Sequence, residues 1–229
     1  QKLTLERAST ERADMLVADA SGAIDDKGLG HAVDAPFNAD PAIIGADPPN
    51  PAVAAPGHYF TEQAIRKSGM KWTFLRNSLY ADYQVPDAQK AIASRKLVHN
   101  RGDGRIAYVA REDCADVAAA ILMEGGHENV TYDVTGPQSF NATELAALYG
   151  ELGGVKIETI RLDDDAFIQG IVNASGSGDD HARYGAKLVA SFGQAIREGF
   201  MANVTDVVAK LTKRPARTLR ETIEPRLKS

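Results

Sequence analysis

The alternation of short apolar runs with segments of helical periodicity constrains this chain more than any other feature of its sequence. After residue 57, apolar runs at residues 72–75, 130–134 and 155–160 are separated by segments whose apolar residues recur at helical spacing. Short apolar runs are typical of strands buried in a parallel sheet, and strands that alternate with helices form βαβ units. The sequence therefore predicts an α/β fold, with a mostly parallel sheet and helices on both faces.

Local signals place the predicted elements. Strands are expected at residues 15–18, 43–44, 72–75, 105–109, 130–134 and 155–160, and helices at residues 31–39, 58–67, 87–94, 182–199, 205–212 and 218–227, with further helices beginning near Asp113, Asn141 and Asp163. Asn141 is followed three residues later by Glu144, which predicts a capping box, and Asp113 is expected to be an N-cap. The prolines of residues 47–57 and the small polar residues 175–180 predict loops.

Three consecutive aspartates, residues 163–165, superficially look like a metal cluster. Consecutive residues of a helix point in different directions, so they cannot all face one ion. We expect them instead to begin a helix, with their negative charges at the positive end of the helix dipole. No metal site is predicted.

Composition and charge exclude several classes of protein. A net charge of -5 is unfavourable for a broad phosphate-binding surface, so nucleic acid is not an expected partner. A single cysteine, Cys114, cannot form an internal disulfide, which favours a reducing, cytoplasmic location. No apolar stretch has the length of a membrane span, and the first residues lack the apolar core of a signal peptide, so no membrane association is expected.

Six segments in order resemble the NmrA-like family of atypical short-chain dehydrogenases, and within it the triphenylmethane reductases and the type 2 NAD(P)H:quinone oxidoreductases. The segments are residues 57–62, 72–80, 102–106, 111–115, 126–132 and 211–215. In the last of them, Lys213 replaces the glycine of the Leu-Thr-Gly-Arg-Pro turn typical of the family. The resemblance covers most of residues 47–229.

This resemblance implies a fold and an activity. It implies a Rossmann-like NAD(P)-binding domain, which we assign to residues 1–135, and a small C-terminal α/β substrate lobe, which we assign to residues 136–229. It also implies hydride transfer from NADH or NADPH to a quinone-like or conjugated aromatic small molecule. In such a reaction the protein aligns donor and acceptor and excludes water. A homodimer is a further expectation.

The family positions also indicate site residues. The expected catalytic residues are His58 and Tyr80, the expected substrate contacts are Tyr80 and Tyr83, and the expected cofactor contacts are Ser21, Gly45, His58 and Asn77. His58 falls where other short-chain dehydrogenases carry a lysine. Gly45 stands where relatives usually carry a serine, which weakens the expected site.

The residues themselves leave alternatives open. His58 could donate to a developing oxyanion with Glu62, one helical turn later, orienting it, or it could begin a helix while Glu62 pairs at the surface with Arg66. Tyr80 and Tyr83 could form the wall of a flat pocket or pack the lobe. Arg76 is expected to anchor the end of a strand rather than bind phosphate.

The glycine-rich loop that holds a dinucleotide pyrophosphate is not found. Such a loop follows a strand as G-x-G-x-x-G, whereas the nearest candidate, residues 20–30, has a different glycine spacing and includes Asp25 and Asp26. We therefore expect the N-terminal βαβ part to be missing or degenerate. This leaves a second hypothesis, a non-catalytic NmrA-like protein that senses a dinucleotide or binds a partner.

Overall fold

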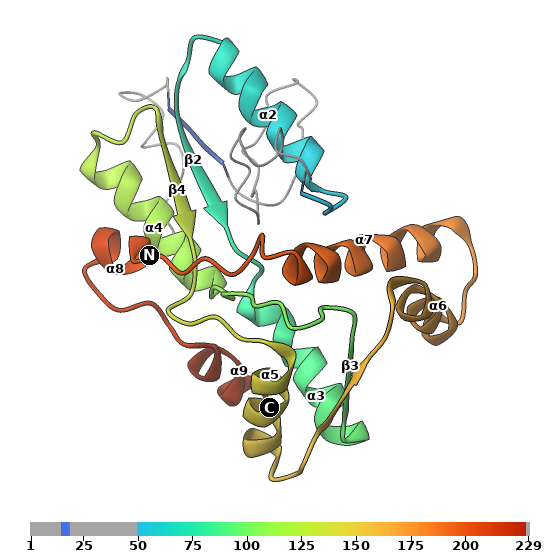
Figure 1. Ribbon diagram of the computed structural model, residues 1–229. Helices are drawn as coiled ribbons and strands as arrows, with labels where there is room; N and C mark the ends of the chain where they lie inside the picture. The colour runs from blue at the N-terminus through green and yellow to red at the C-terminus, as the bar shows by residue number, and fades with distance from the viewer. Residues whose placement is uncertain (1–14, 19–49, 228–229) are drawn as a thin grey trace.

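The first sheet of the fold consists of parallel strands. The structure, a computed structural model, describes Met15–Ala18 and residues 50–227. Within these residues β1 (Met15–Ala18), β2 (Lys71–Asn77) and β4 (Val130–Val134) lie side by side in the order β1-β2-β4 (Figure 1). β2 is parallel to both neighbours, so the carboxyl ends of all three strands lie at one edge of the sheet.

Helices cover both faces of this sheet. Successive side chains of a strand point to opposite faces, so Phe74 and Leu75 of β2 face different sides. Phe74 packs against Ile65 of α2 (Ala55–Lys67), and Leu75 belongs to a cluster with Val117 of α4 (Arg111–Glu124). The predicted Rossmann-like arrangement, a parallel sheet between helices, is confirmed.

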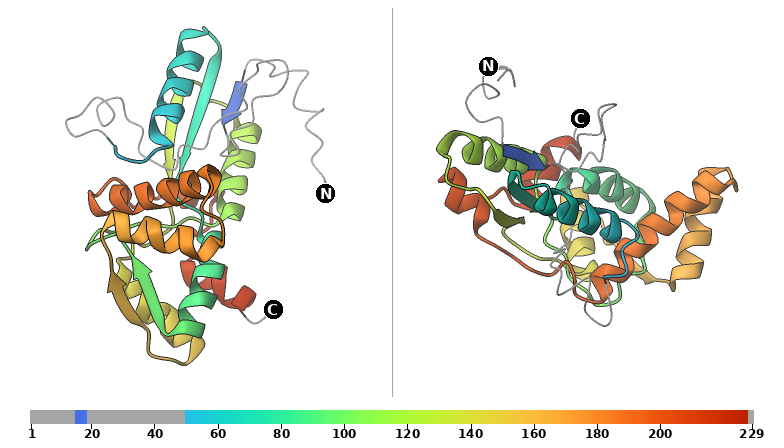
Figure 2. Two further views of the ribbon diagram at one scale, coloured as in Figure 1. Left: turned by 90° about the vertical axis from the view of Figure 1, so that its right-hand side faces the viewer. Right: turned by 90° about the horizontal axis from the view of Figure 1, so that it is seen from above.

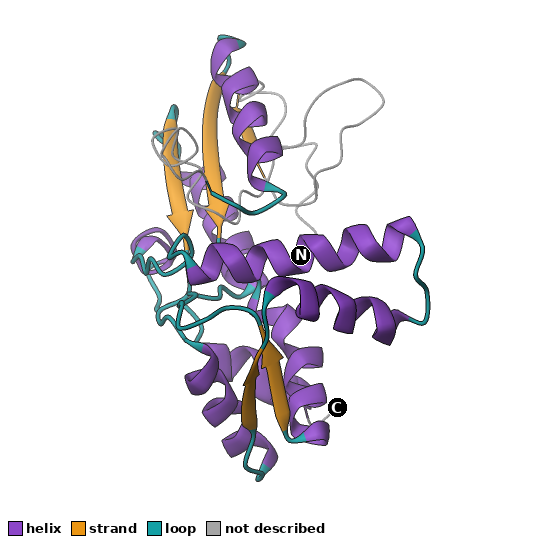
Figure 3. Ribbon diagram, turned by 45° about the vertical axis from the view of Figure 1, so that its right-hand side comes forward, coloured by secondary structure: helices purple, strands orange, loops and turns teal. Residues whose placement is uncertain are grey.

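A second, two-stranded parallel sheet lies apart from the first (Figure 3). It pairs β3 (Lys96–His99) with β5 (Glu158–Arg161), and α3 (Gln84–Ser94) and α5 (Ala142–Gly153) contact it. β3 comes from the sequence assigned to the first domain and β5 from the sequence assigned to the lobe. The division at residues 135 and 136 stays a prediction.

Two long helices lie across the middle of the molecule (Figure 2). α6 (Asp164–Ser175) and α7 (Asp180–Arg197) pack against one another. A short loop joins them, as predicted from the small polar residues 175–180. Asp163 caps α6 by accepting a hydrogen bond from the amide of Ala166 at 2.8 Å. The interpretation of residues 163–165 as a helix start is therefore confirmed.

The C-terminal segment packs against helices that flank the two sheets. α8 (Val207–Thr212) packs against α4, and α9 (Leu219–Leu227) packs against α3 and the 3-10 helix η2 (Ala81–Tyr83). Within the described residues, no helix combines the length and the apolar character needed to cross a lipid bilayer.

The strand predicted at residues 105–109 is wrong. This segment is extended and buried, but its backbone hydrogen bonds go to separate places: Ile106 bonds to Phe140, Ala107 to Met201 and Val109 to Leu79. The apolar run at residues 105–109 therefore correctly indicated a buried segment, but not a strand. It extends neither sheet, because its hydrogen-bond partners lie outside the strands of both.

Other boundaries differ because distant residues decide them. The Asp113 N-cap is wrong, since α4 begins at Arg111 and Asp113 lies inside its first turn, fully buried. β3 was not predicted, and α2 and α3 begin three residues earlier than expected. The Asn141 capping box is confirmed, with the Glu144 amide 2.9 Å from Asn141 Oδ1. The helix at residues 31–39 and the strand at residues 43–44 lie outside the described residues.

Candidate active site

A cavity of about 550 Å³ opens between the carboxyl ends of β2 and β3. The start of α2, the turn after β2, and α3 form part of its wall, and α6 and α7 supply apolar side chains on another part. Ligands of open α/β sheets bind at the carboxyl ends of strands, because side chains from several connecting loops converge there. The residues lining this cavity are Ala54, His58, Ser78, Leu79, Tyr80, Tyr83, Gln84, Asp87, Asn100, Arg101, Tyr108, Phe167, Leu188, Val189, Phe192, Gly193 and Ile196.

His58 lies in the first turn of α2 and lines this cavity. Its Nδ1 atom is buried and has no hydrogen-bond partner among the described residues. Burial lowers the pKa of His58 to about 4, although the negative charge of Glu62 opposes the change. The imidazole is therefore neutral at physiological pH, so it can donate a hydrogen bond from one ring nitrogen and accept one at the other.

Glu62 does not orient His58 through a hydrogen bond. Its carboxylate accepts from Arg76, with Oε1 2.8 Å from Nε and Oε2 2.8 Å from an Nη atom, and also from Arg66 at 3.1 Å. Glu62 is only 5% exposed and Arg76 7%. The pairing with Arg66 and the anchoring role of Arg76 are confirmed, but Glu62 is buried instead of lying on the surface.

Tyr80 and Tyr83 both line the cavity, with their ring centroids 6.0 Å apart. The guanidinium of Arg111 lies over both rings, 5.1 Å from the centroid of Tyr80 and 4.8 Å from that of Tyr83. Tyr80 also packs beside the core cluster of α4, whereas Tyr83 is 58% exposed. Tyr80 therefore does both things that the sequence left open: it forms part of the pocket wall and it packs against a core cluster.

Asn77 ends β2 and is only 3% exposed. Its Oδ1 atom has no hydrogen-bond partner among the described residues, so a buried acceptor remains available at the edge of the sheet. The next residue, Ser78, lines the cavity. Ser21 and Gly45, the other expected cofactor contacts, lie outside the described residues, as does the candidate glycine-rich segment at residues 20–30.

A polar group of residues that the sequence did not single out forms another part of the cavity wall. Arg101, which follows β3, donates a hydrogen bond to the hydroxyl of Tyr108 at 2.8 Å. Asp87 of α3 lines the same cavity, and burial raises the pKa of its carboxyl, although Arg101 and Lys90 oppose the change. Behind them the hydroxyl of Tyr149 donates to Gln84 Oε1 at 2.8 Å.

The end of β3 is held firmly against α6 and α7. Asn100 is 2% exposed, and its Nδ2 atom donates to Asp164 Oδ1 and to the carbonyl of Ala190, each at 2.8 Å. Arg197 donates to the Asn100 carbonyl at 2.5 Å and to both oxygens of Asp164. Gly193 allows this close approach, because a Cβ atom there would lie 1.8 Å from Asn100 Oδ1. These contacts fix the position of the cavity wall.

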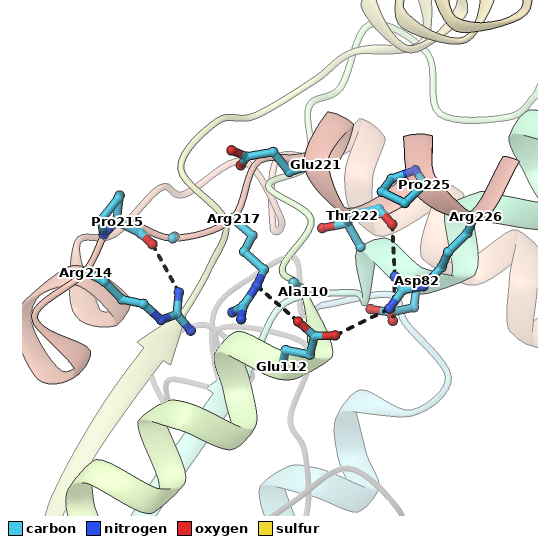
Figure 4. Close-up of a pocket in the computed structure, with 11 residues that line it drawn as sticks. Asp82, Ala110, Glu112, Arg214, Pro215, Arg217, Glu221, Thr222, Pro225 and Arg226 are labelled. Carbon is cyan, nitrogen blue, oxygen red and sulfur yellow. Dashed lines mark hydrogen bonds and ion pairs between the residues drawn. The ribbon is translucent and has the colours of Figure 1, made fainter. Parts of the chain in front are cut away.

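A second cavity, of about 530 Å³, lies beneath the C-terminal segment (Figure 4). It contains several arginines, but acidic side chains already neutralise them: Figure 4 shows Glu112 between Arg217 and Arg226. Arg214 and Arg217 both pair with the buried carboxylate of Asp113. This cavity is therefore the space around a structural ion-pair network, and it shows no set of groups poised for chemistry.

The described residues contain no group of three or more His, Cys, Asp or Glu side chains placed to hold a metal ion. The side chains available to a cofactor ring are those of Ser78 and Tyr80, which follow β2, and of His58 in α2, with the buried Asn77 beside them at the end of β2.

Comparison with known proteins identifies relatives of this chain, although no protein-family model matches it. It is 29% identical over 185 residues to an NAD(P)H azoreductase of Xenophilus azovorans, covering 78% of this chain and 60% of the azoreductase. It is 28% identical over 187 residues to quinone oxidoreductase 2 of Escherichia coli, covering 82% of this chain and 63% of that protein. The chain thus spans less than two thirds of these relatives.

Solved structures agree with these relatives. The NADPH complex of the Escherichia coli quinone oxidoreductase superposes with a TM-score of 0.71 at 27% identity, over 77% of this chain and 60% of that one. Triphenylmethane reductase of Citrobacter sp. gives a TM-score of 0.67 at 33% identity, over 76% and 59%. An oxidoreductase of Aspergillus flavus with an NmrA-like family domain is 23% identical over 157 residues, covering 69% of this chain and 50% of that protein. The resemblance seen in the sequence is therefore confirmed: the chain is similar to NAD(P)H-dependent reductases and to an oxidoreductase with an NmrA-like family domain.

Proposed function

We propose that this chain is an NAD(P)H-dependent reductase that transfers hydride to a quinone-like or conjugated aromatic small molecule. The observation that carries the proposal is the largely apolar cavity at the carboxyl ends of β2 and β3, lined by His58, Tyr80 and Tyr83. Its relatives include an azoreductase, a quinone oxidoreductase and a triphenylmethane reductase. These names all refer to reductases of conjugated molecules.

The described residues fit the nicotinamide end of the cofactor. The buried Oδ1 of Asn77 is an acceptor without a donor among the described residues, which suits the amide group of a nicotinamide ring. Ser78 and Tyr80 follow it at the edge of the cavity. The reduced nicotinamide, when bound, would supply the hydride for the acceptor.

The side chains of the chain would provide binding, alignment and hydrogen bonding. Tyr80, Phe167 and Phe192 offer ring faces against which a flat acceptor can lie, and they exclude water from the site. Hydride transfer to a carbonyl or azo group leaves negative charge on a heteroatom. Neutral His58 can donate a hydrogen bond to that atom, while the proton that completes the reduction comes from solvent.

Reduction of 1,4-naphthoquinone tests the proposal. The purified protein should oxidise NADPH or NADH only when the quinone is present, measured as loss of the absorbance of the reduced nicotinamide. His58→Phe should lower kcat on the order of 10-fold or more, because the donor is lost. His181→Gln, on the exposed side of α7, is the matched control and should retain activity. No quinone-dependent oxidation, with the Escherichia coli enzyme active in parallel, would refute the proposal.

The relatives named above do not favour the hypothesis of a non-catalytic regulator, since each is named for an oxidoreductase activity. Dimer formation and cytoplasmic location remain predictions. The size of the elution peak in gel filtration with light scattering tests the first.

A further inference from the structure

Arg101 places a positive charge in the wall of the cavity. It follows β3, lines the cavity and donates from one Nη atom to the hydroxyl of Tyr108. Among the described residues it forms no ion pair with a carboxylate, in contrast to Arg214, Arg217 and Arg226 of the second cavity. A guanidinium has five N–H donors, so the bond to Tyr108 leaves most of them unused.

The unused donors of Arg101 face no other partner among the described residues. Arg101 is half-buried and lines the cavity, and within this part of the chain only one of its Nη atoms donates a side-chain hydrogen bond, to Tyr108. The backbone here is also fixed: the Arg101 amide donates to His99 Nδ1 at 3.3 Å, and the Asn100 carbonyl accepts from Arg197. The guanidinium is therefore held in place before any ligand enters.

The other titratable groups of the cavity leave Arg101 without a direct ion pair, although the charge of Asp87 acts on it from a distance. His58 is neutral because its pKa is about 4, and burial raises the pKa of the Tyr108 phenol, so it is neutral as well. Asp87 is the acidic residue of the lining, and burial raises the pKa of its carboxyl. Asp87 does not approach Arg101 within ion-pair distance, so no carboxylate of the lining occupies the guanidinium donors.

We propose that Arg101 binds an anionic substituent of the acceptor, so that the preferred substrates are flat conjugated molecules carrying a carboxylate or a sulfonate. The ring would lie among Tyr80, Phe167 and Phe192, while the anionic group would meet the guanidinium. The planar fork of arginine suits the two oxygens of such a group. This inference rests on the proposed function and names its acceptor class.

A matched pair of acceptors tests the proposal, namely 1,4-naphthoquinone and 1,4-naphthoquinone-2-sulfonate. In Arg101→Met, kcat/KM for the sulfonate should fall on the order of 10-fold or more through a higher KM, while the neutral quinone changes by less than about 3-fold. Arg101→Lys should recover part of the loss, because it restores the charge without the fork. Arg95→Met, an exposed arginine one strand away, is the control and should change neither acceptor.

A binding measurement separates this inference from the proposed function. Naphthalene-2-sulfonate has the ring and the charge but no reducible group. Calorimetry should show its affinity falling on the order of 10-fold or more in Arg101→Met, with no comparable loss in Arg95→Met. Circular dichroism must show that each variant is folded, and Arg101→Lys serves if the methionine variant is not.

The outcomes are distinct. Suppose that the wild type reduces both quinones. If Arg101→Met then lowers kcat/KM equally for both, or for neither, the inference is overturned while the proposed function stands. If neither quinone is reduced, the proposed function fails, and the naphthalene-2-sulfonate measurement alone decides whether Arg101 binds anions. Equal affinity in the wild type and Arg101→Met would overturn that as well.

Discussion

The neutral state of His58 predicts a specific loss of stability in acid. Burial lowers the pKa of His58 from 6.5 to about 4, so below pH 6.5 the unfolded chain binds a proton that the folded chain refuses. The free energy of unfolding must then fall as the pH falls, since stability rises with pH wherever the unfolded state binds more protons. The loss begins near pH 6.5 and is complete below pH 4.

The magnitude follows from the two pKa values. A difference between 6.5 and about 4 corresponds to at most about 3 kcal/mol, because each pKa unit is worth about 1.36 kcal/mol. Linkage with these values gives a loss of about 2 kcal/mol at pH 5 and about 3 kcal/mol at pH 4, relative to pH 7. Histidines with ordinary pKa values would contribute nothing comparable.

Urea unfolding of the wild type and His58→Gln at pH 7, 6, 5 and 4 measures this effect. All other groups titrate in both proteins, so the difference in unfolding free energy isolates His58. The unfolding free energy of the variant minus that of the wild type should rise by about 2 kcal/mol from pH 7 to pH 5. NMR of the His58 ring should show a transition near pH 4. A constant difference across the series, or a His58 transition near pH 6.5, would refute the reasoning.

Further predictions concern packing, burial and capping. Gly193→Ala should lower the unfolding free energy by about 1–3 kcal/mol, because its Cβ would overlap the buried asparagine after β3. Gly185→Ala in the same helix has open space around it and should instead raise stability by up to about 1 kcal/mol; the same sign for both in thermal unfolding would contradict this. Glu62→Gln should cost about 3–5 kcal/mol in urea unfolding, since the buried pair with Arg76 would lose its negative charge, and a cost below about 1 kcal/mol would mean that water reaches the pair. Asn141→Ala should cost about 1 kcal/mol in the same assay, whereas Asn141→Ser keeps a capping oxygen and should cost little.

Local patterns predicted most of the first sheet and its helices. β2 and β4 are apolar runs bounded by turns, and α5 begins at a capping box whose two bonds join residues three apart. Such signals are visible in sequence because the interacting residues are neighbours in the chain. The resemblance to reductases singled out His58, Tyr80 and Tyr83, which line one cavity. Residue patterns alone had left the roles of these residues undecided.

Features set by distant residues could not be predicted. β3 has four residues, and it forms only because β5, about sixty residues later, pairs with it. Without β3 there was no reason to consider Arg101 or to expect it opposite α3. Asp113 failed as an N-cap for a similar reason, because the cations that allow its burial, Arg214 and Arg217, are about a hundred residues away in sequence.

The burial of Asp113 links the closing stretch of the chain to the first sheet. Asp113 has no exposed surface, and it accepts from the backbone amide of Arg217 at 2.7 Å as well as from the two arginine side chains. Separation of the segment after Thr212 from α4 would remove every one of these partners from a carboxylate that is buried in the folded protein. We therefore expect the segment after Thr212 to unfold cooperatively with α4 and the first sheet, and not by local fraying.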